Sequence, residues 1–412
     1  MPDPEKVDAI RRLLPATSAG IYLNAGSVGP MPAETQAAMD EQAAHELAVG
    51  RAKVEQFLAF VDRMAEARAA VASVVVADPD DIALTHSATD GLNLVISSLA
   101  WTPGDRVLTT NHEHPGVLGP LQALRDRIGV VVDKVDVGDG GDDEQTIAAF
   151  RAALEQPVKA VVISHVLWTT GAILPVGRLG TLAREAGAVT IVDGAQAAGA
   201  IPLRLEDLDV DAYAMPGQKW LLGPEGMGAL WVRRAFADAV VPATSGYLAY
   251  ASFSGELGGT LHPGARRFEA TGFHRPSVIG LARSCGWLSM FVGVPWALER
   301  ANRLAGIALD RLASIEGVSL LTPRGHSGTL VTFRIAGWSS GRAAGELGSR
   351  AFAILRNIPP VDAVRISVGF WNTESELETV AQVVELLAAH TPETLPERRT
   401  LAILGSDGRP IS

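Results

Sequence analysis

The sequence predicts an α/β fold, with a large domain built on a mainly parallel β-sheet and a smaller α+β domain at the C-terminal end. The first observation is that short apolar runs alternate with amphipathic helical stretches from about residue 81 to 232. Strands that alternate with helices in this way form a parallel sheet with helices on both faces. The second observation is that this alternation stops after about residue 275. With 412 residues, 47% of them hydrophobic, the chain can form one large or two medium cores.

Short apolar runs mark the candidate strands of the large sheet. They are DIALTH (81–86), RVLTT (106–110), VVVDKV (130–135), AVVISHV (160–166), AVTIVD (188–193), DAYAM (211–215) and GALWV (228–232). Stretches with a helical pattern, such as GVLGPLQALRDRI, lie between several of them. Ligands of such sheets bind beyond the carboxyl ends of the strands. We therefore expect the functional residues to follow these runs directly.

The remaining chain predicts the second domain and a tail. The expected boundaries are 16–275 for the large domain, 1–15 together with 276–395 for the small domain, and 396–412 for the tail. The small domain starts with a long helical region (276–315) and continues with GVSLL, TLVTFRI, a helix at 341–350, AFAIL, VRISV and the helix TESELETVAQVVELLAAH. The tail has little periodicity, and we expect it to be mobile.

Charge and composition exclude several classes of protein. The formal net charge is -11, and no block is rich in Lys or Arg, which argues against nucleic-acid binding. The single cysteine, Cys285, excludes a disulfide framework and a multi-thiolate metal site, and fits a reducing cytoplasm. The N-terminus lacks the apolar region of a signal peptide, and no apolar run reaches about 18 residues. We therefore expect a cytoplasmic enzyme that binds a small molecule, without membrane or nucleic acid as a partner.

Asp193 and Lys219 predict the cofactor. Asp193 ends a strand-like run, where its carboxylate can keep a pyridine nitrogen protonated and make the ring of pyridoxal 5'-phosphate (PLP) an electron sink. Lys219 lies in a glycine-bearing turn after the next run, where a poorly solvated amine can be neutral and nucleophilic. Alone, each has a commoner explanation, a strand-end or N-cap aspartate and a surface lysine. Together they are the pair that PLP held as a Schiff base requires.

Two further motifs lie after strand-like runs. THSATDGLNL (85–94) is a small-residue turn that opens a helix, and Thr89 with the free backbone amides there can bind a phosphate. Ordinary N-capping by Ser87 or Thr89 is the alternative, and both can hold together. In NHEHPG, His114 can stack on an aromatic cofactor. His112 and His114 without a nearby cysteine or carboxylate cluster make a weak metal site, so we expect no metal.

Arg365 lies inside an apolar run near the C-terminus, VRISV. An unpaired guanidinium would be costly there, so either a bound carboxylate or a structural salt bridge must compensate it. Glycine-rich nucleotide motifs are absent, because no GxGxxG follows a strand and no GxxxxGK[ST] occurs. The sequence therefore favours PLP and a substrate with a carboxylate.

Taken together, the motifs resemble the class V aminotransferase family of fold-type I PLP enzymes. The motifs are SATDGL, EHPG, SHVLWTTGAILPV, VDGAQAAGAIPL, GQKWLLGPEGMGALWV, RRFEATG and VRISVGFWNTESEL, in order from about residue 20 to 390. This family includes cysteine desulfurases, isopenicillin N epimerases and cysteine/cystine C–S lyases. The resemblance implies the fold of a PLP-dependent transferase.

The resemblance also implies a role for each matched residue. It places the Schiff base on Lys219, the pyridine nitrogen of PLP on Asp193 and the phenolic oxygen near Gln196. It places the PLP ring against His114 and the phosphate on Ala88 and Thr89. It assigns the substrate carboxylate to Arg365. It implies a homodimer, in which the segment 266–272, with Thr271, reaches towards the partner's phosphate site.

The reaction is predicted from departures within the family. Cysteine desulfurases carry a reactive cysteine shortly before the carboxylate-binding arginine, and here the stretch RNIPPVDAVR has none. The motifs EHPG and SH-x-LW-x-TG, with Arg356 and Arg365, look closest to those of the C–S lyases. This resemblance implies that Trp168, Thr169 and Arg356 also belong to the substrate site. We expect β-elimination from cystine or an S-substituted cysteine, giving a thiol, pyruvate and ammonia. An epimerase or a decarboxylating deaminase is the alternative, ahead of an aminotransferase or a non-catalytic scaffold.

Some positions depart from the family pattern beside the lysine and the RFE segment. Gln218 and Pro216 stand where the family usually has His and Ser or Thr, and Gln218 can still bind the phosphate whereas Pro216 cannot. After RFE, His274 and Arg275 are bulky residues near the expected substrate mouth. These changes predict a specialised substrate.

Overall fold

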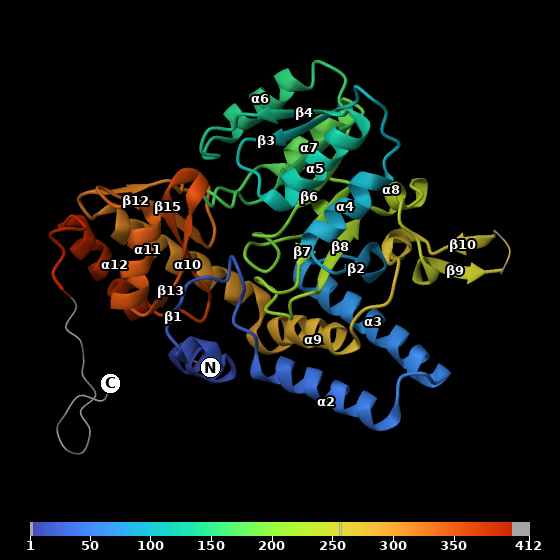
Figure 1. Ribbon diagram of the computed structural model, residues 1–412, viewed down its shortest axis with the longest axis horizontal. Coiled ribbons are helices and arrows are strands. Elements are labelled where there is room, and N and C mark those ends of the chain that lie inside the picture. Colours follow the sequence, from blue (N-terminus) through green and yellow to red (C-terminus); the bar gives the residue numbers. More distant parts are fainter. Residues whose placement is uncertain (1–2, 255, 257, 398–412) are drawn as a thin grey trace.

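The computed structural model describes residues 3–254, 256 and 258–397 and contains a large and a small β-sheet (Figure 1). The large sheet has the strand order β2-β8-β7-β6-β5-β3-β4. Its strands are β2 (Ile82–Thr85), β3 (Arg106–Thr110), β4 (Val131–Val135), β5 (Ala160–Ser164), β6 (Val189–Asp193), β7 (Ala212–Pro216) and β8 (Gly228–Val232). Only β8 runs opposite to the others. The predicted α/β fold with a mainly parallel sheet is confirmed, and each predicted run contains a strand.

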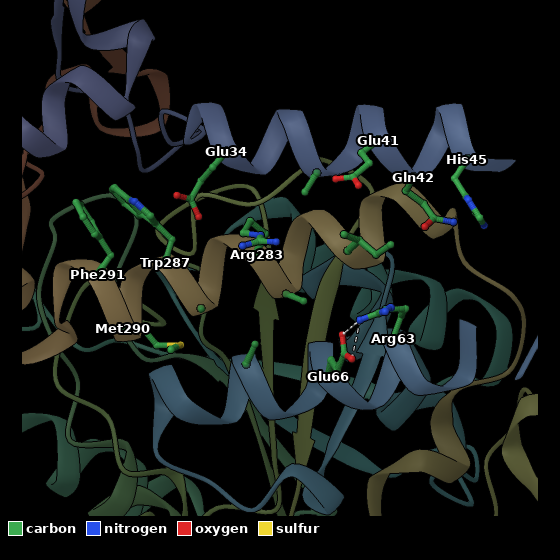
Figure 2. Close-up of a pocket in the computed structure, with 15 residues that line it drawn as sticks. Glu34, Glu41, Gln42, His45, Arg63, Glu66, Arg283, Trp287, Met290 and Phe291 are labelled. Carbon is green, nitrogen blue, oxygen red and sulfur yellow. Dashed lines mark hydrogen bonds and ion pairs between the residues drawn. The ribbon is translucent and has the colours of Figure 1, made fainter. Parts of the chain in front are cut away.

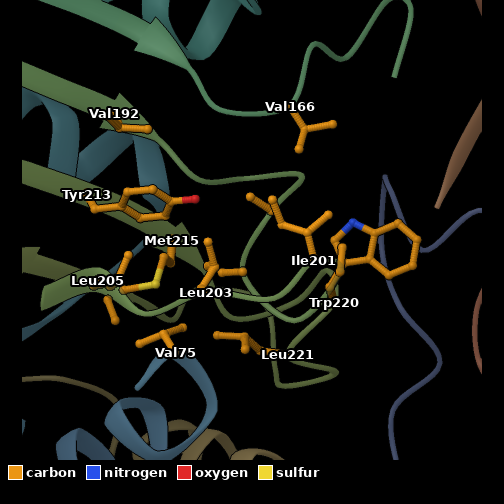
Figure 3. Close-up of a cluster of buried hydrophobic side chains, with 14 of the residues drawn as sticks. Val75, Val166, Val192, Ile201, Leu203, Leu205, Tyr213, Met215, Trp220 and Leu221 are labelled. Atoms are coloured by element: carbon orange, nitrogen blue, oxygen red, sulfur yellow. The ribbon is translucent and has the colours of Figure 1, made fainter. Parts of the chain in front are cut away.

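Helices cover both faces of this sheet, which explains why β5, β7 and β8 are buried at every position. On one face, alternate strand residues such as Ala160 and Val162 pack with α4 (Ala88–Ser98) and α5 (Pro115–Ile128). On the other face, Val161 and Ile163 belong to the core that includes α3 (Val54–Val75), α6 (Asp143–Ala153) and α7 (Val176–Glu185). Figure 3 shows part of this second core, with Tyr213 and Met215 of β7 among its aliphatic side chains.

The helical region predicted at 276–315 is not continuous. It consists of α9 (Arg275–Gly286), a π-helical turn (Trp287–Val292) and α10 (Val294–Ala313). The bend of 82° lies at Gly293, whose φ of 81° is left-handed, with a proline at the start of α10. In the described part of the chain, no single helix is long and apolar enough to cross a membrane, and α9 and α10 reach that limit only as this bent pair. With α2 (Ala33–Val49) and α3, α9 forms a helical layer on the large sheet (Figure 1).

The small sheet is antiparallel and has its own core. Its strand order is β11-β12-β15-β14, with β11 (Val318–Leu320), β12 (Leu330–Ile335), β14 (Arg356–Ile358) and β15 (Ala363–Ser367). This core also includes α10, α11 (Ser340–Arg350) and α12 (Glu374–Ala388). The short strands β1 (Ile21–Tyr22) and β13 (Ala353–Ile354) pair with each other, as do β9 (Tyr250–Phe253) and β10 (Gly259–Leu261).

The N-terminal helix contacts the C-terminal part of the chain. Helix α1 (Asp3–Leu13) meets the C-terminal part of the chain through an ion pair from Arg11 to Glu376. The division into 16–275, 1–15 with 276–395, and 396–412 stays a prediction. Residues 398–412 of the predicted tail lie outside the described residues.

Candidate active site

Loops that follow β3, β5, β6 and β7 meet around one cavity at the carboxyl ends of these parallel strands. Its empty space is about 230 Å³, and its lining residues are His114, Ser164, Val166, Trp168, Asp193, Ala195, Gln196 and Lys219. Strand ends of a parallel sheet share one edge, so residues far apart in sequence come together here. The structure thus brings together Lys219, Asp193, His114, Gln196 and Trp168 among the predicted site residues.

Lys219 is held in the turn between β7 and β8. The backbone N–H of Gly217 donates to Met227 O, and the N–H of Gly223 donates to Gly217 O, which closes the turn. A Cβ at Gly29 would collide with the carbonyl oxygen of Lys219, so only glycine fits against this turn. Burial lowers the pKa of Lys219 to about 8, against the opposing effect of Asp193. Among the described residues, no hydrogen bond or ion pair engages its amine, which is therefore available as a nucleophile.

Asp193 ends β6 on the cavity wall. Its Oδ1 accepts a hydrogen bond of 2.9 Å from the Ala195 amide, and no donor among the described residues reaches Oδ2. Burial raises the pKa of this carboxyl, while Lys219 and the Ala195 amide act in the opposite direction. The free oxygen is suited to a cationic N–H donor.

His114 is the N-cap of α5, and its ring borders the cavity. Its Nδ1 accepts a 3.0 Å hydrogen bond from the Gly116 amide, and its ring meets Trp168 edge-on at 5.0 Å between centroids. Burial, with smaller effects of Lys219, Arg356 and Arg365, lowers the pKa of His114 to about 4. The imidazole is therefore neutral at physiological pH and can face an aromatic ring without adding positive charge.

The start of α4 lies beside this ring and has room for an anion. Ala88 and Thr89 form its first turn after the N-cap Ser87, whose side chain accepts from the Asp90 amide. A Cβ on Gly116 would lie 2.7 Å from Thr89 Oγ1 and 3.2 Å from His114 Nδ1, so the glycine keeps this space open. Gln218 Oε1 is buried without a hydrogen-bond partner. The helix N-terminus and the Thr89 hydroxyl fit a phosphate, whereas the unpaired Gln218 oxygen is an acceptor and could not itself bind one.

Arg365 and Arg356 lie opposite each other on β15 and β14. The Arg365 side chain is 1% exposed, and its Nη1 donates to Trp168 O at 2.8 Å, while Nε and Nη2 have no partner. Burial and Arg356 lower its pKa to about 9. Arg356 donates to Ser27 Oγ at 3.2 Å and stands 6.0 Å from the centre of the Trp168 ring. No carboxylate of the described residues pairs with either arginine, which disagrees with the structural salt bridge considered for Arg365.

The residues present fit PLP on structural grounds. An unbonded amine, a free carboxylate oxygen and a neutral aromatic neighbour line one cavity, the start of α4 lies beside that aromatic neighbour, and PLP has a complementary group for each. Gln196 is already bonded on both sides, because its Nε2 donates to Gly26 O at 2.8 Å and its Oε1 accepts from Trp220 at 3.1 Å. Across the described residues, no group of three or more His, Cys, Asp or Glu is arranged for a metal ion.

Other predicted residues lie elsewhere. Thr169 Oγ1 bonds His112 Nδ1 at 2.7 Å, which ties two loops together rather than facing the cavity. His274 Nδ1 bonds Ser277 Oγ at 2.8 Å. Arg275 stands 5.3 Å from the Phe60 ring and 4.0 Å from Glu46 Oε1. Thr271 is exposed. None of the last three lines the cavity of its own protomer, so their predicted roles stay predictions.

Two buried carboxylates were missed by the sequence analysis. Glu113, inside the EHPG motif, is 5% exposed and bonds both Thr110 and Ser164. Glu269, inside RRFEATG, pairs with Arg68 at 3.0 Å and accepts from the Leu84 amide. Both stand inside motifs that carry the family resemblance, which was the available signal, because nearby residues, His112 and His114 or Arg266 and Arg267, are polar and do not indicate burial.

A larger, open groove lies between α2, α3 and α9 (Figure 2). Its polar side chains include Glu34, Glu41 and the bonded pair Arg63–Glu66, whose closest atoms are 2.6 Å apart. It contains no lysine and none of the predicted site residues. The smaller cavity at the strand ends is therefore the candidate active site.

Comparisons with known proteins agree on the family. The family described as aminotransferase class-V matches residues 21–380. Isopenicillin N epimerase of Streptomyces clavuligerus is 30% identical over 387 residues, which cover 89% of this chain and 94% of that protein. A probable cysteine desulfurase 2 of Mycobacterium leprae (strain TN) is 30% identical over 339 residues, 80% of this chain and 79% of its own.

Solved structures of the cystine C–S lyase C-DES are also similar. One is a mutant with glycine covalently linked to the PLP cofactor, at a TM-score of 0.85 and 25% identity, covering 91% of this chain and 99% of that chain. Another is the complex with the reaction product cysteine persulfide, at a TM-score of 0.84 and 25% identity, covering 90% and 99%.

Proposed function

The chain belongs to the class-V aminotransferase family and is a PLP-dependent enzyme, and on that premise we propose that it is a C–S lyase acting on cystine or another S-substituted cysteine. In the overall reaction, an S-substituted cysteine and one water give a thiol, pyruvate and ammonia, whereas cystine, whose leaving group keeps the S–S bond, gives cysteine persulfide in place of the thiol. The Cβ–S bond breaks, the sulfur leaves with the bonding pair and is protonated, and water supplies the keto oxygen of pyruvate.

The pair of guanidiniums beside Trp168, a residue that lines the cavity, carries this proposal. Arg365 has two buried donors without a partner, and Arg356 stands opposite on the neighbouring strand, beside Trp168. A carboxylate can accept both free donors of Arg365 in a bidentate bond. Cystine has a second carboxylate at its far end. We assign that carboxylate to Arg356, the other cation of the pair. Similarity to the cystine C–S lyase C-DES supports the same substrate class.

The only cysteine supports elimination rather than sulfur transfer to a protein thiol. Cys285 is fully buried in α9, and burial raises its pKa to about 12. A nucleophilic thiol must be accessible and have a low pKa, so Cys285 is not suited to attack sulfur. Direct elimination requires no such thiol.

Lys219 and Asp193 have the chemical roles in this proposal. When bound, PLP supplies an electron sink for the negative charge that develops at the substrate's Cα. We assign the covalent link to Nζ of Lys219, which also takes the Cα proton once substrate has displaced it, because its lowered pKa favours the neutral amine. We assign the ring nitrogen to the free oxygen of Asp193, which keeps that nitrogen protonated.

The other assignments concern position. The neutral ring of His114 would lie against the face of PLP, with Gln196 beside its phenolic oxygen. Ala88 and Thr89 would hold the phosphate, with the amide NH2 of Gln218 as a further donor, and Arg365 would hold the substrate carboxylate. Trp168, whose carbonyl accepts from Arg365, would hold that guanidinium beside the cavity.

An epimerase is the second candidate, because isopenicillin N epimerases of two organisms are 30% and 29% identical to this chain over 89% of its length. Such an enzyme would remove and return the Cα proton with the carbon skeleton intact. The same lysine and aspartate would serve that reaction, so only the products distinguish the two.

Product analysis tests the proposal. Purified holoenzyme incubated with a panel of S-substituted cysteines should release pyruvate, ammonia and thiol in equal amounts, measured by lactate-dehydrogenase coupling and thiol titration. With cystine it should release pyruvate, ammonia and cysteine persulfide in equal amounts, the persulfide being measured by cyanolysis. The variant Cys285→Ala should retain this activity within about twofold, because the thiol is buried away from the cavity.

An intact amino acid with inverted Cα would support the epimerase instead. Loss of activity in Cys285→Ala with unchanged unfolding temperature would contradict elimination without a protein thiol.

We also infer that the enzyme acts as a homodimer. Thr271 is exposed and does not line its own cavity, and large apolar side chains such as Leu47 (89% exposed) and Tyr247 (63%) lie at the surface. A homodimer would cover apolar surface of this kind. Light scattering should give about twice the chain mass of 43.3 kDa, and a single chain mass would contradict it. The cytoplasm stays the predicted compartment.

A further inference from the structure

Glu113 lies directly behind the cavity wall and has no part in the reaction proposed above. It precedes His114 in the loop between β3 and α5. Its Oε1 accepts from Thr110 Oγ1 at 2.7 Å and from the Ser164 amide at 3.1 Å, and its Oε2 accepts from Ser164 Oγ at 2.5 Å. One carboxyl group therefore ties the end of β3 to the end of β5, next to the residue that borders the cavity.

Ser164 connects Glu113 with the cofactor site. It is the last residue of β5, lines the cavity, and is the register partner of Asp193 on β6. Asp193 is the charged group of the described residues that acts on Glu113 through space. Glu113 thus forms a second buried carboxyl at the end of the cavity where Asp193 lies.

The hydrogen bonds of Glu113 do not require an ionisable side chain at this position. Burial raises its pKa to about 7, Asp193 adds to this rise, and the three hydrogen bonds only partly oppose it. A glutamine could make the same contacts, because its oxygen can accept from Thr110 and the Ser164 amide while its NH2 donates to Ser164 Oγ. A buried ionisable group where a neutral one would suffice is typical of functional sites.

We propose that Glu113 is a positioning residue for PLP, which holds the His114 loop on the cavity wall and adds a second negative charge that favours the protonated ring nitrogen paired with Asp193. This inference rests on the proposed placement of PLP between Asp193 and Lys219. The positive groups of the site, Lys219, Arg356 and Arg365, act on His114, and none of them acts on Glu113. Through its bond to Ser164, the register partner of Asp193, the Glu113 carboxyl stands at the Asp193 end of the cavity.

The variant Glu113→Gln isolates this charge, because it keeps the size and the contacts of the side chain. At pH 8, where Glu113 is mostly ionised, the PLP dissociation constant should rise about tenfold. The pH midpoint of the visible absorption change of the bound cofactor should fall by roughly one unit, because removing a negative charge disfavours a nearby cation. Both readouts are independent of turnover.

Two variants serve as controls. Asp211→Asn removes another buried carboxylate, bonded to the Thr190 amide at the opposite ends of the strands, and should change the unfolding temperature but not the absorption midpoint. Glu113→Asp keeps a carboxylate and shortens the side chain that reaches Ser164, so it should weaken the circular dichroism of the bound cofactor and move the midpoint less than Glu113→Gln does.

Unchanged PLP affinity and an unchanged midpoint in Glu113→Gln would overturn the inference. An equal shift in Glu113→Asp would also overturn it, by assigning the effect to packing. Failure of the unmutated protein to hold PLP on Lys219 would instead overturn the proposed function, a result that needs no variant at Glu113.

Discussion

Replacing Lys219 with alanine should lower the rate of C–S cleavage at least about 1,000-fold, because it removes both the covalent attachment and the base at Cα. The purified variant should also lose the visible absorption of PLP held on the protein. The Lys219 amine has no hydrogen bond among the described residues, and its burial disfavours the charged form. The unfolding temperature of the apo form should therefore stay the same or rise.

Lys159→Ala is the matched control. Lys159 pairs with Asp105 at 2.6 Å, just before β5 and β3 and therefore at the far ends of these strands. Its removal should leave absorption and turnover unchanged. Turnover by Lys219→Ala within tenfold of the unmutated enzyme would show that another group serves as base.

Replacing Arg365 with lysine should raise KM for the amino-acid substrate roughly 10- to 100-fold, with a smaller change in kcat. Lysine keeps a positive charge but cannot offer two parallel donors to one carboxylate, and hydrogen bonds to charged groups contribute about 1.5–3 kcal/mol each. The two free donors of Arg365, Nε and Nη2, are the atoms that the substrate would engage. Steady-state kinetics with cystine measure the effect.

The control for Arg365 is Arg334→Ala in the same sheet. Arg334 is exposed and bonds only the carbonyl of Val361, so its loss should leave KM unchanged. PLP absorption should persist in Arg365→Lys, because the arginine is assigned to the substrate and not to the cofactor. An unchanged KM in Arg365→Lys would remove Arg365 from the carboxylate site.

Much of the large sheet could be predicted because both of its faces are buried. RVLTT and GALWV match β3 and β8 to the residue, since continuous apolar runs between helical patterns have few other interpretations. The bend at Gly293 was missed because the apolar pattern of 276–315 continues through the π-helical turn. Gly293 and Pro295 are helix stop and start signals that the sequence does contain, but they stand inside an otherwise continuous apolar pattern.

The site was predictable where its chemistry stands at strand ends. Asp193 and Lys219 share one cavity because β6 and β7 are parallel neighbours. Glu113 was missed because its partner Ser164 lies 51 residues away, and no local pattern indicates that bond. The bond of Thr169 to His112 also depends on loop packing. Long-range contacts of side chains in loops are the part that the sequence alone did not reveal.

The central claim is that Lys219 holds PLP at this strand-end cavity, and mapping of the attachment tests it most directly. The chain has five lysines, Lys6, Lys53, Lys134, Lys159 and Lys219, so the site can be located without ambiguity. Borohydride reduction of the holoenzyme, followed by digestion and mass spectrometry, should place the phosphopyridoxyl group on the peptide that contains Lys219. Stoichiometric modification of another lysine, or none at all, would contradict the account.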